Sequence, residues 1–218
     1  MKTFILSLLI LSTNAFALEG LSIPNSFQVD RHGHVFRGKE PKSAVEELAH
    51  FGISDVIIYK NEVKDEVQKE ILALNSLGIN AYHIPFRWKE YESMELACEQ
   101  TVEALNLIYR IKAKGGRVFF HCTAGEDRTG MLAGLYRMLE ERIPGKVAFQ
   151  YEMCARGYSD GNGRKPPLVT GAIQKELTPL FITLAQKIEN REWKLGHIPK
   201  RSCQGLVVYP TKLQCRNK

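Results

Sequence analysis

The stretch from His121 to Gly130 constrains this chain more than any other part of its sequence. The apolar run 118–120 comes directly before it and predicts a buried strand, and the run 131–139 after it predicts a helix. A strand, a tight glycine-containing turn and a helix form the repeating unit of parallel α/β sheets. The sequence therefore predicts an α/β fold, with this turn at the carboxyl end of a strand, where such folds bind their ligands.

Within this turn, five residues separate Cys122 from Arg128, a spacing suited to holding a phosphate group. Backbone N–H groups of such a loop point inward, and the N-terminus of the following helix adds partial positive charge. The same field is expected to lower the pKa of the Cys122 thiol and make it nucleophilic. The guanidinium binds two phosphoryl oxygens at once, which a lysine cannot do. These residues predict a site for phosphate-ester chemistry.

The stretch resembles the signature loop of the cysteine-dependent phosphatases of the protein tyrosine and dual-specificity class, His-Cys-x5-Arg-Ser/Thr. The resemblance implies Cys122 as the nucleophile and Arg128 as the phosphate clamp. It implies that the Thr129 hydroxyl bonds the sulfur and assists hydrolysis of the thiophosphate, and that His121 orients the loop. The other loop residues would surround the phosphate: Thr123, Ala124, Gly125, Glu126 and Gly130.

The resemblance extends beyond the loop, over roughly residues 22–190. The segment Phe36-Arg37-Gly38-Lys39-Glu40-Pro41 is similar to the early Arg-Gly/Ser-x-x-Pro segment of dual-specificity phosphatases. It implies one α/β domain, placed at residues 18–195, whose central, largely parallel sheet is flanked by helices. We expect no cofactor and no metal, because cysteine phosphatases need none and because the neighbouring His32 and His34 lack an apparent third ligand.

Two other functions use part of the same pattern. Rhodanese-like domains, which transfer sulfur, also place a cysteine in an anion-binding loop, but His121 and the pair Arg128-Thr129 favour a phosphatase. A module that binds phosphorylated ligands without turnover is the second alternative, and the intact Cys122 argues against it.

The sequence departs from the family at the proton donor. Phosphomonoester cleavage by a thiolate needs a proton for the leaving oxygen. The family supplies it from an upstream aspartate, but this chain has no aspartate between Asp65 and Asp127. The candidates, in order, are Glu90, which lies where the family's acid resides, Asp127 inside the loop, and Glu92. Burial or a neighbouring carboxylate must raise the pKa of the true donor, because it must be protonated at working pH.

Basic residues near the expected site favour a substrate with several phosphates. Arg87 and Lys89 lie in the segment of Glu90 and are expected to bind substrate. Other cations in segments expected to rim the site are Lys39, Arg156, Arg164 and Lys165. The pattern predicts hydrolysis of an inositol polyphosphate, as in the exported bacterial tyrosine-phosphatase-like phytases, which the chain resembles. Phosphotyrosine protein is the alternative substrate.

The net charge and the leader sequence limit which partners the protein can have and in which compartment it works. A net charge of +6, without a Lys/Arg run interleaved with aromatics, predicts a polyanionic small-molecule substrate, no nucleic acid and no stable membrane association. Residues 1–17 read as a signal peptide, with a positive start, an apolar run and the cleavage signal Ala15-Phe16-Ala17. We therefore expect an exported protein, periplasmic or secreted, that begins at Leu18.

The five cysteines include one that must stay free if the site works. That residue is Cys122. We expect a disulfide between Cys203 and Cys215 that pins a C-terminal extension, residues 196–218. Cys98 and Cys154 then remain, as a second pair or as two buried thiols.

Patterning predicts the order of the elements. Strands are expected at residues 27–29, 35–37, 55–59, 80–84 and 118–120. Helices are expected at residues 43–51, 64–77, 93–113, 131–139, 145–156 and 171–190, with a Gly/Pro-rich segment, 157–167, before the last one.

Overall fold

The computed structural model describes residues 21–86, 93–159, 165–209 and 213–215, and five strands in these ranges form one sheet. The strands are β1 (Phe27–Gln28), β2 (Val35–Lys39), β3 (Asp55–Ile58), β4 (Asn80–His83) and β5 (Val118–Cys122). Their order in the sheet is β1-β2-β5-β3-β4. β1 runs antiparallel to β2, and the other neighbouring pairs are parallel. This confirms the predicted α/β fold with a largely parallel sheet.

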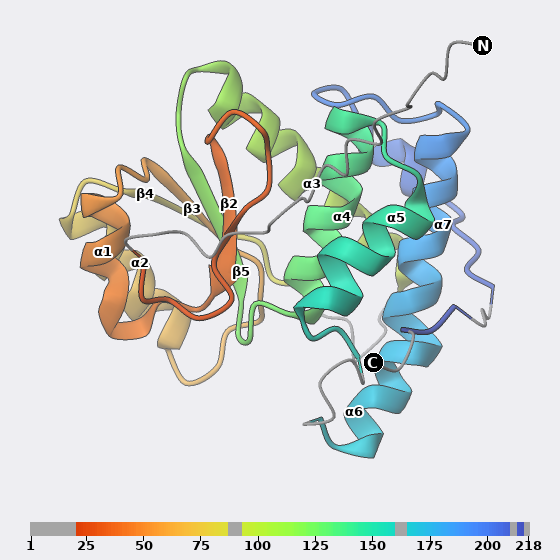
Figure 1. Ribbon diagram of the computed structural model, residues 1–218, viewed down its shortest axis with the longest axis horizontal. Coiled ribbons are helices and arrows are strands. Elements are labelled where there is room, and N and C mark those ends of the chain that lie inside the picture. The colour runs from red at the N-terminus through yellow and green to blue at the C-terminus, as the bar shows by residue number, and fades with distance from the viewer. Residues whose placement is uncertain (1–20, 87–92, 160–164, 210–212, 216–218) are drawn as a thin grey trace, which may run out of the picture.

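Helices cover both faces of this sheet (Figure 1). The α-helices are α1 (Val45–His50), α2 (Glu66–Ser76), α3 (Met94–Ala113), α4 (Asp127–Glu141), α5 (Gly145–Ala148), α6 (Pro167–Ala172) and α7 (Thr178–Glu189). Short 3-10 turns are η1 (Lys42–Ala44), η3 (Cys154–Arg156) and η5 (Lys200–Cys203), and π-helical segments are η2 (Phe149–Met153) and η4 (Ile173–Leu177).

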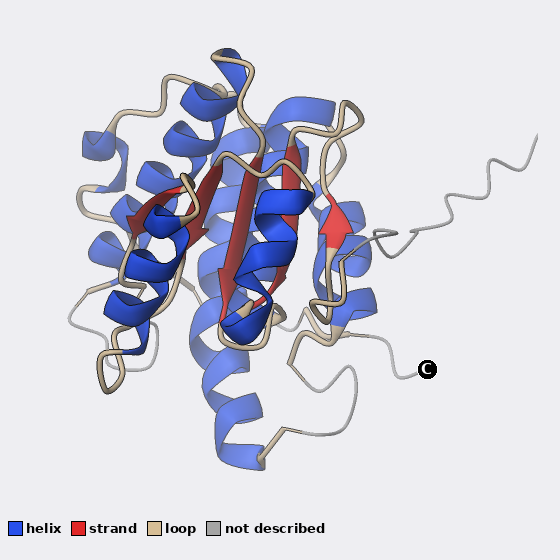
Figure 2. Cartoon of the chain, turned by 90° about the vertical axis from the view of Figure 1, so that its left-hand side faces the viewer, coloured by secondary structure: helices blue, strands red, loops and turns tan. Residues whose placement is uncertain are grey.

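Alternate residues of the central strands bury apolar side chains on opposite faces of the sheet. On one face, Val56 and Phe119 belong to a core cluster that includes residues of α1 and α2. On the other face, Ile57 and Phe120 belong to a larger cluster with residues of α3, α4 and α7. Figure 2 views the sheet from the side of α1 and α2, with helices in front of and behind the strands. β5 lies between β2 and β3, so Cys122 ends the central strand of the sheet.

The last long helix begins earlier than the sequence predicts. α6, η4 and α7 follow one another from Pro167 to Glu189, whereas patterning placed the start at residue 171. Pro166 is the N-cap of α6 and Pro167 the first helical residue. Proline fits there, because its fixed φ suits a helix and its missing N–H would have no partner in the first turn. In the described residues, no helix has the length and hydropathy needed to cross a membrane.

Two disulfides, Cys98–Cys203 and Cys154–Cys215, join the C-terminal segment to the rest of the domain. The predicted Cys203–Cys215 bridge is therefore wrong, and so are both arrangements expected for Cys98 and Cys154. The reason is that the two tail cysteines lie against different elements: η5 packs on α3, which carries Cys98, whereas Cys215 meets η3. Cys122 is free, as predicted.

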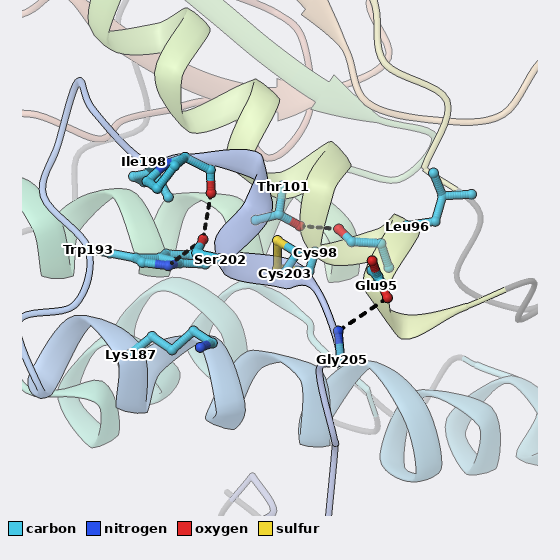
Figure 3. Close-up of a disulfide and its surroundings, with 12 residues drawn as sticks. Glu95, Leu96, Cys98, Thr101, Lys187, Trp193, Ile198, Ser202, Cys203 and Gly205 are labelled. Carbon is cyan, nitrogen blue, oxygen red and sulfur yellow. Dashed lines mark hydrogen bonds between the residues drawn. A yellow bond between two sulfur atoms is a disulfide. The ribbon is translucent and has the colours of Figure 1, made fainter.

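Hydrogen bonds hold the tail around the first of these disulfides (Figure 3). Trp193 Nε1 donates to Ser202 Oγ at 3.0 Å, and the N–H of Gly205 donates to Glu95 Oε2 at 3.3 Å. Trp193 and Cys203 are buried and belong to the larger core cluster. The segment from Trp193 to Cys203 therefore packs against the core through these two side chains.

Each disulfide is expected to stabilise the fold, because it closes a long loop of the unfolded chain. The paired cysteines are 105 and 61 residues apart, separations at which loop closure alone gives roughly 4–5 kcal/mol. The double variant Cys98→Ala/Cys203→Ala should lower the free energy of unfolding by about that amount in a urea titration. Wild type in excess reductant, which opens both bridges, is the comparison. A variant midpoint equal to that of the oxidised wild type would contradict this role.

Candidate active site

Strand β5 brings Cys122 to the carboxyl edge of the sheet. Lys39, the last residue of β2, is its register partner on one side, and His121 pairs with β3 on the other. Cys122 is 3% exposed. Residues 123–126 then turn the chain into α4, which begins at Asp127. The thiol thus lies between a central strand and a helix N-terminus.

Gly125 allows the loop to pass against β2. Its φ is +69°, and a Cβ at this position would lie 2.4 Å from the carbonyl carbon and oxygen of Gly38. Gly38 is equally confined, since a Cβ there would lie 2.5 Å from the ring of Phe119. Any side chain at residue 125 would therefore push the loop away from the sheet.

Two donors hold the carbonyl of Gly125. Arg37 Nη2 and Asn25 Nδ2 each donate to this oxygen at 2.8 Å. The C=O and N–H of a trans peptide point in opposite directions, so these bonds turn the N–H of Glu126 away from the two donors. Arg37 has no solvent exposure. The loop is therefore fixed from the interior of the protein.

Glu152 balances the buried charge of Arg37. Its Oε2 lies 3.4 Å from Arg37 Nη1, and its Oε1 accepts from Arg137 Nη1 at 2.7 Å. Burial lowers the pKa of Arg37, and the charges of Glu152 and Cys122 oppose this shift. The guanidinium thus supports the loop and also adds positive potential at the sulfur.

The environment of Cys122 favours its thiolate form. Burial raises the pKa of this thiol, but the charge of Arg128 and the adjacent hydroxyl and N–H of Thr129 lower it, and the net pKa lies below the usual value. Asp127 acts in the opposite direction. A thiolate at the start of α4 also gains from the positive end of the helix dipole. The arrangement can supply a sulfur nucleophile at neutral pH.

The loop opens to solvent at Thr123 and Ala124, which are exposed. Arg128 Nη2 donates to Thr123 Oγ1 at 3.3 Å, so the guanidinium reaches across the loop. Gly130, one turn into α4, is buried, and a Cβ there would lie 3.0 Å from the carbonyl oxygen of Glu152. The absence of a side chain lets α4 approach η2 and keeps the loop close to its supports.

His121, the residue before Cys122, is paired with a carboxyl group of helix α2. Its Nε2 lies 2.8 Å from Glu70 Oε1, and both side chains are buried. Glu70 belongs to α2, so the pair ties the end of β5 to that helix. The imidazole beside Cys122 is thereby fixed in orientation.

The two acids of the loop meet a lysine from a distant segment. Lys165 Nζ lies 2.7 Å from Glu126 Oε2 and 2.9 Å from Asp127 Oδ1. Asp127 Oδ1 also accepts from the N–H of Ser159 at 2.9 Å. Burial raises the pKa of Asp127, and its net pKa lies above the usual value although Lys165 and the Ser159 N–H lower it. Asp127 is therefore a carboxyl group that holds its proton more tightly than an ordinary one.

Part of the predicted site lies outside the described residues, namely Arg87, Lys89, Glu90, Glu92 and Arg164. The described chain stops before that segment at Phe86, whose ring packs on Tyr59 with centroids 4.6 Å apart. The charges of Arg128 and Cys122 act on Tyr59, so the Tyr59–Phe86 pair lies close to the loop. Within the described ranges, no group of three or more His, Cys, Asp or Glu side chains is placed to hold a metal ion.

Sequence reasoning missed three residues that support the loop. Arg37 and Asn25 hold its carbonyl, and Glu70 contacts its histidine. Two of them left a signal in the sequence. Arg37 is a charge that directly follows the apolar Val35 and Phe36 in a strand, and Glu70 occupies the helix face of Val67 and Leu74, where a buried acid needs a partner.

Comparison with known proteins identifies the family. A model described as the tyrosine phosphatase family matches residues 18–159, which is more than half of the chain and includes the whole loop. The chain belongs to the tyrosine phosphatase family. No curated protein sequence matches it.

Solved structures of phosphatases share its fold. The active form of Tk-PTP is 18% identical with a TM-score of 0.53, and the match covers 77% of this chain and 98% of Tk-PTP. A variant of TpbA from P. aeruginosa in complex with pTyr is 17% identical with a TM-score of 0.53, covering 80% and 98%. The core catalytic domain of the PP-IP phosphatase SIW14 from S. cerevisiae, in complex with citrate, is 19% identical with a TM-score of 0.50, covering 77% and 86%.

Family membership gives the class of reaction. The chain is a cysteine-dependent phosphatase, a phosphoric monoester hydrolase. The free, buried Cys122 beside Arg128 is the arrangement that tyrosine phosphatase chemistry requires.

In this cysteine-dependent phosphatase, the Thr129 hydroxyl is expected to set part of the Cys122 pKa. Thr129→Val removes the hydroxyl but keeps the shape, and should raise the pKa of the thiol by roughly one to two units, since a hydrogen bond to a charged group contributes about 1.5–3 kcal/mol. The pH dependence of alkylation by iodoacetamide measures the shift, and its midpoint should move to higher pH. Thr129→Ser, which keeps the hydroxyl, should leave the midpoint in place. Equal midpoints in wild type and Thr129→Val would refute the assignment.

Proposed function

We propose that this phosphatase hydrolyses inositol polyphosphates through a cysteinyl-phosphate intermediate. The supporting observation is a group of cations from separate segments around the loop. Lys39 is the register partner of Cys122, and Lys165 contacts both loop acids. Arg156 approaches the loop through its backbone, whose carbonyl accepts from Asn25 Nδ2 at 3.3 Å, while its guanidinium lies over the ring of Phe27. Several cations near one phosphate site suit a substrate with several phosphates, and the PP-IP phosphatase SIW14 has a similar fold.

The proposed reaction has two steps. The Cys122 thiolate attacks phosphorus, an S–P bond forms, and the bond from phosphorus to the substrate oxygen breaks. Arg128 and the loop N–H groups bind the phosphoryl oxygens as charge redistributes. Water then attacks phosphorus, the S–P bond breaks, and inorganic phosphate leaves with Cys122 restored as thiolate. Thr129 stabilises the departing sulfur by hydrogen bonding.

We assign the proton transfers to Asp127. This carboxyl group is largely buried beside the loop, and its pKa is raised. In the first step it gives its proton to the leaving alkoxide oxygen, and in the second its carboxylate takes a proton from the attacking water. Glu90, outside the described residues, is the alternative donor.

We also propose that the protein is exported and that residues 1–17 are removed. The leader sequence supports this, and so do the two disulfides, because such bonds persist in oxidising compartments. N-terminal sequencing of protein recovered outside the cytoplasm tests it, and an N-terminus other than Leu18 would contradict the cleavage site.

A phosphotyrosine protein is the second candidate substrate. The match to the tyrosine phosphatase family favours it, and TpbA, of similar fold, has been determined with pTyr. The two substrates differ in charge, since a phosphotyrosine side chain carries one phosphate and makes little use of additional cations.

The two candidate substrates can be distinguished by their kcat/KM values. Wild type should have a higher kcat/KM for inositol hexakisphosphate than for a phosphotyrosine peptide, and Cys122→Ser should release no phosphate from either. Both results are measured by the release of inorganic phosphate from each substrate, with wild type and with the variant. A peptide with the higher kcat/KM would favour the phosphotyrosine function, and equal activity of wild type and Cys122→Ser would exclude the cysteinyl-phosphate mechanism.

The proton donor is tested with leaving groups of different quality. Asp127→Asn should lower kcat by about 10²–10⁴ for an inositol phosphate, whose alkoxide needs a proton, and much less for p-nitrophenyl phosphate, whose leaving group does not. Wild-type activity that depends on protonated Asp127 should fall as pH rises through its raised pKa. Glu90→Gln is the matched variant. If Glu90→Gln loses kcat only with the inositol phosphate, and Asp127→Asn does not, the proton donor is Glu90.

A further inference from the structure

Lys165 is a cation that belongs neither to the loop nor to its interior supports. Its Nζ contacts Glu126 Oε2 at 2.7 Å, Asp127 Oδ1 at 2.9 Å and the carbonyl oxygen of Gly157. These partners are two carboxylates and a carbonyl, so every contact is of a type that a phosphate oxygen can replace. A lysine has a flexible stem and a compact charge, and it can change partners without movement of the backbone.

The two loop acids oppose the binding of a phosphate. Glu126 and Asp127 are adjacent in sequence at the start of α4, and the charge of Asp127 reaches Cys122, where phosphorus must bind. A bound phosphate dianion brings further negative charge to this place. Lys165 offsets part of the repulsion, and it does so from next to the site rather than from within the loop.

We propose that Lys165 exchanges partners during the reaction: it pairs with Asp127 and Glu126 in the empty site, and with a flanking phosphate of a polyphosphorylated substrate in the occupied site. It is then the specificity-determining residue that makes the enzyme prefer substrates with several phosphates. The proposal rests on the proposed function, with Asp127 as proton donor, and deepens it.

The exchange couples substrate recognition to the proton of Asp127. Burial and the neighbouring Glu126 raise the pKa of Asp127, and Lys165 and the Ser159 N–H lower it. When Lys165 turns to a flanking phosphate, one of the two groups that lower this pKa is removed. Two further titratable groups interact with Asp127, namely Cys122 and Tyr158. Both stay in place during the exchange. A polyphosphorylated substrate therefore favours the protonated form of Asp127, which can donate, whereas a substrate with one phosphate leaves this carboxyl group paired to the lysine.

The test uses two substrates whose leaving oxygen is in both cases a secondary alkoxide of an inositol ring, inositol hexakisphosphate and an inositol monophosphate. Lys165→Met should lower kcat/KM for the hexakisphosphate roughly tenfold, the effect of one lost charge-assisted contact. For the monophosphate it should cause no loss, and the alkaline limb of the pH–rate profile should move to higher pH, because Asp127 loses the cation that favours its carboxylate. A purely structural role would lower both activities together.

Two lysine variants serve as controls. Lys165→Arg keeps the charge and should keep most of the preference for the hexakisphosphate. Lys175→Met removes an exposed lysine from η4 and should leave both activities unchanged. The proposal is overturned if Lys165→Met lowers both activities by the same factor, or if it leaves the ratio of the two kcat/KM values as in wild type.

A second variant covers the case in which Lys165→Met does not fold. Glu126→Gln leaves the lysine with one loop carboxylate and removes a charge that raises the pKa of Asp127. The alkaline limb with the monophosphate should then move to lower pH, opposite to the shift in Lys165→Met. An unmoved limb would also overturn the proposal. Wild type that hydrolyses neither inositol substrate would refute the proposed function itself, which separates the two failures.

Discussion

Arg37 and the carbonyl of Gly125 form the contact on which the phosphate loop depends. A loop that binds a dianion must turn its N–H groups toward one point, and its carbonyls must then find donors elsewhere. A fully buried arginine supplies such a donor, and its charge is balanced by Glu152. A buried charge without its partner is strongly destabilising, so Arg37 and Glu152 can be kept only together. The loop is thus held in place by a guanidinium that water cannot reach, so water cannot replace the bond from Arg37 to the Gly125 carbonyl.

Around this support, the same small space stabilises a thiolate and a protonated carboxyl group. Arg128 and Thr129 lower the pKa of Cys122, and burial raises that of Asp127. The helix N-terminus alone would favour the anion at both positions. The difference comes from direct contacts, since the sulfur meets the charge of Arg128 whereas the carboxyl group lies beside another acid, Glu126.

The elements that local patterning specifies were predictable from the sequence. The apolar run before Cys122, the glycine turn and the helix after it depend on residues close together in the chain, and so does the order of strands and helices. The disulfides were not predictable, because Cys98 meets Cys203 only after the tail has packed on α3. Lys165 was expected at the rim of the site, but its pairing with the loop acids could not be predicted, for the same reason. Lys165 reaches Asp127 across a contact between residues 38 positions apart, and no spacing rule reports it.

The pairing of the other cysteines determines how the nucleophile responds to oxidants. Four of the five cysteines are held in two bridges, which leaves Cys122 as the single thiol of the chain. Many redox-sensitive thiols survive oxidation because a neighbouring resolving cysteine converts the sulfenic acid to a disulfide. This chain has no such neighbour. Peroxide that reaches Cys122 therefore leaves a sulfenic acid that only an external thiol can rescue before irreversible oxidation, so the working lifetime of each molecule is tied to the small thiols around it.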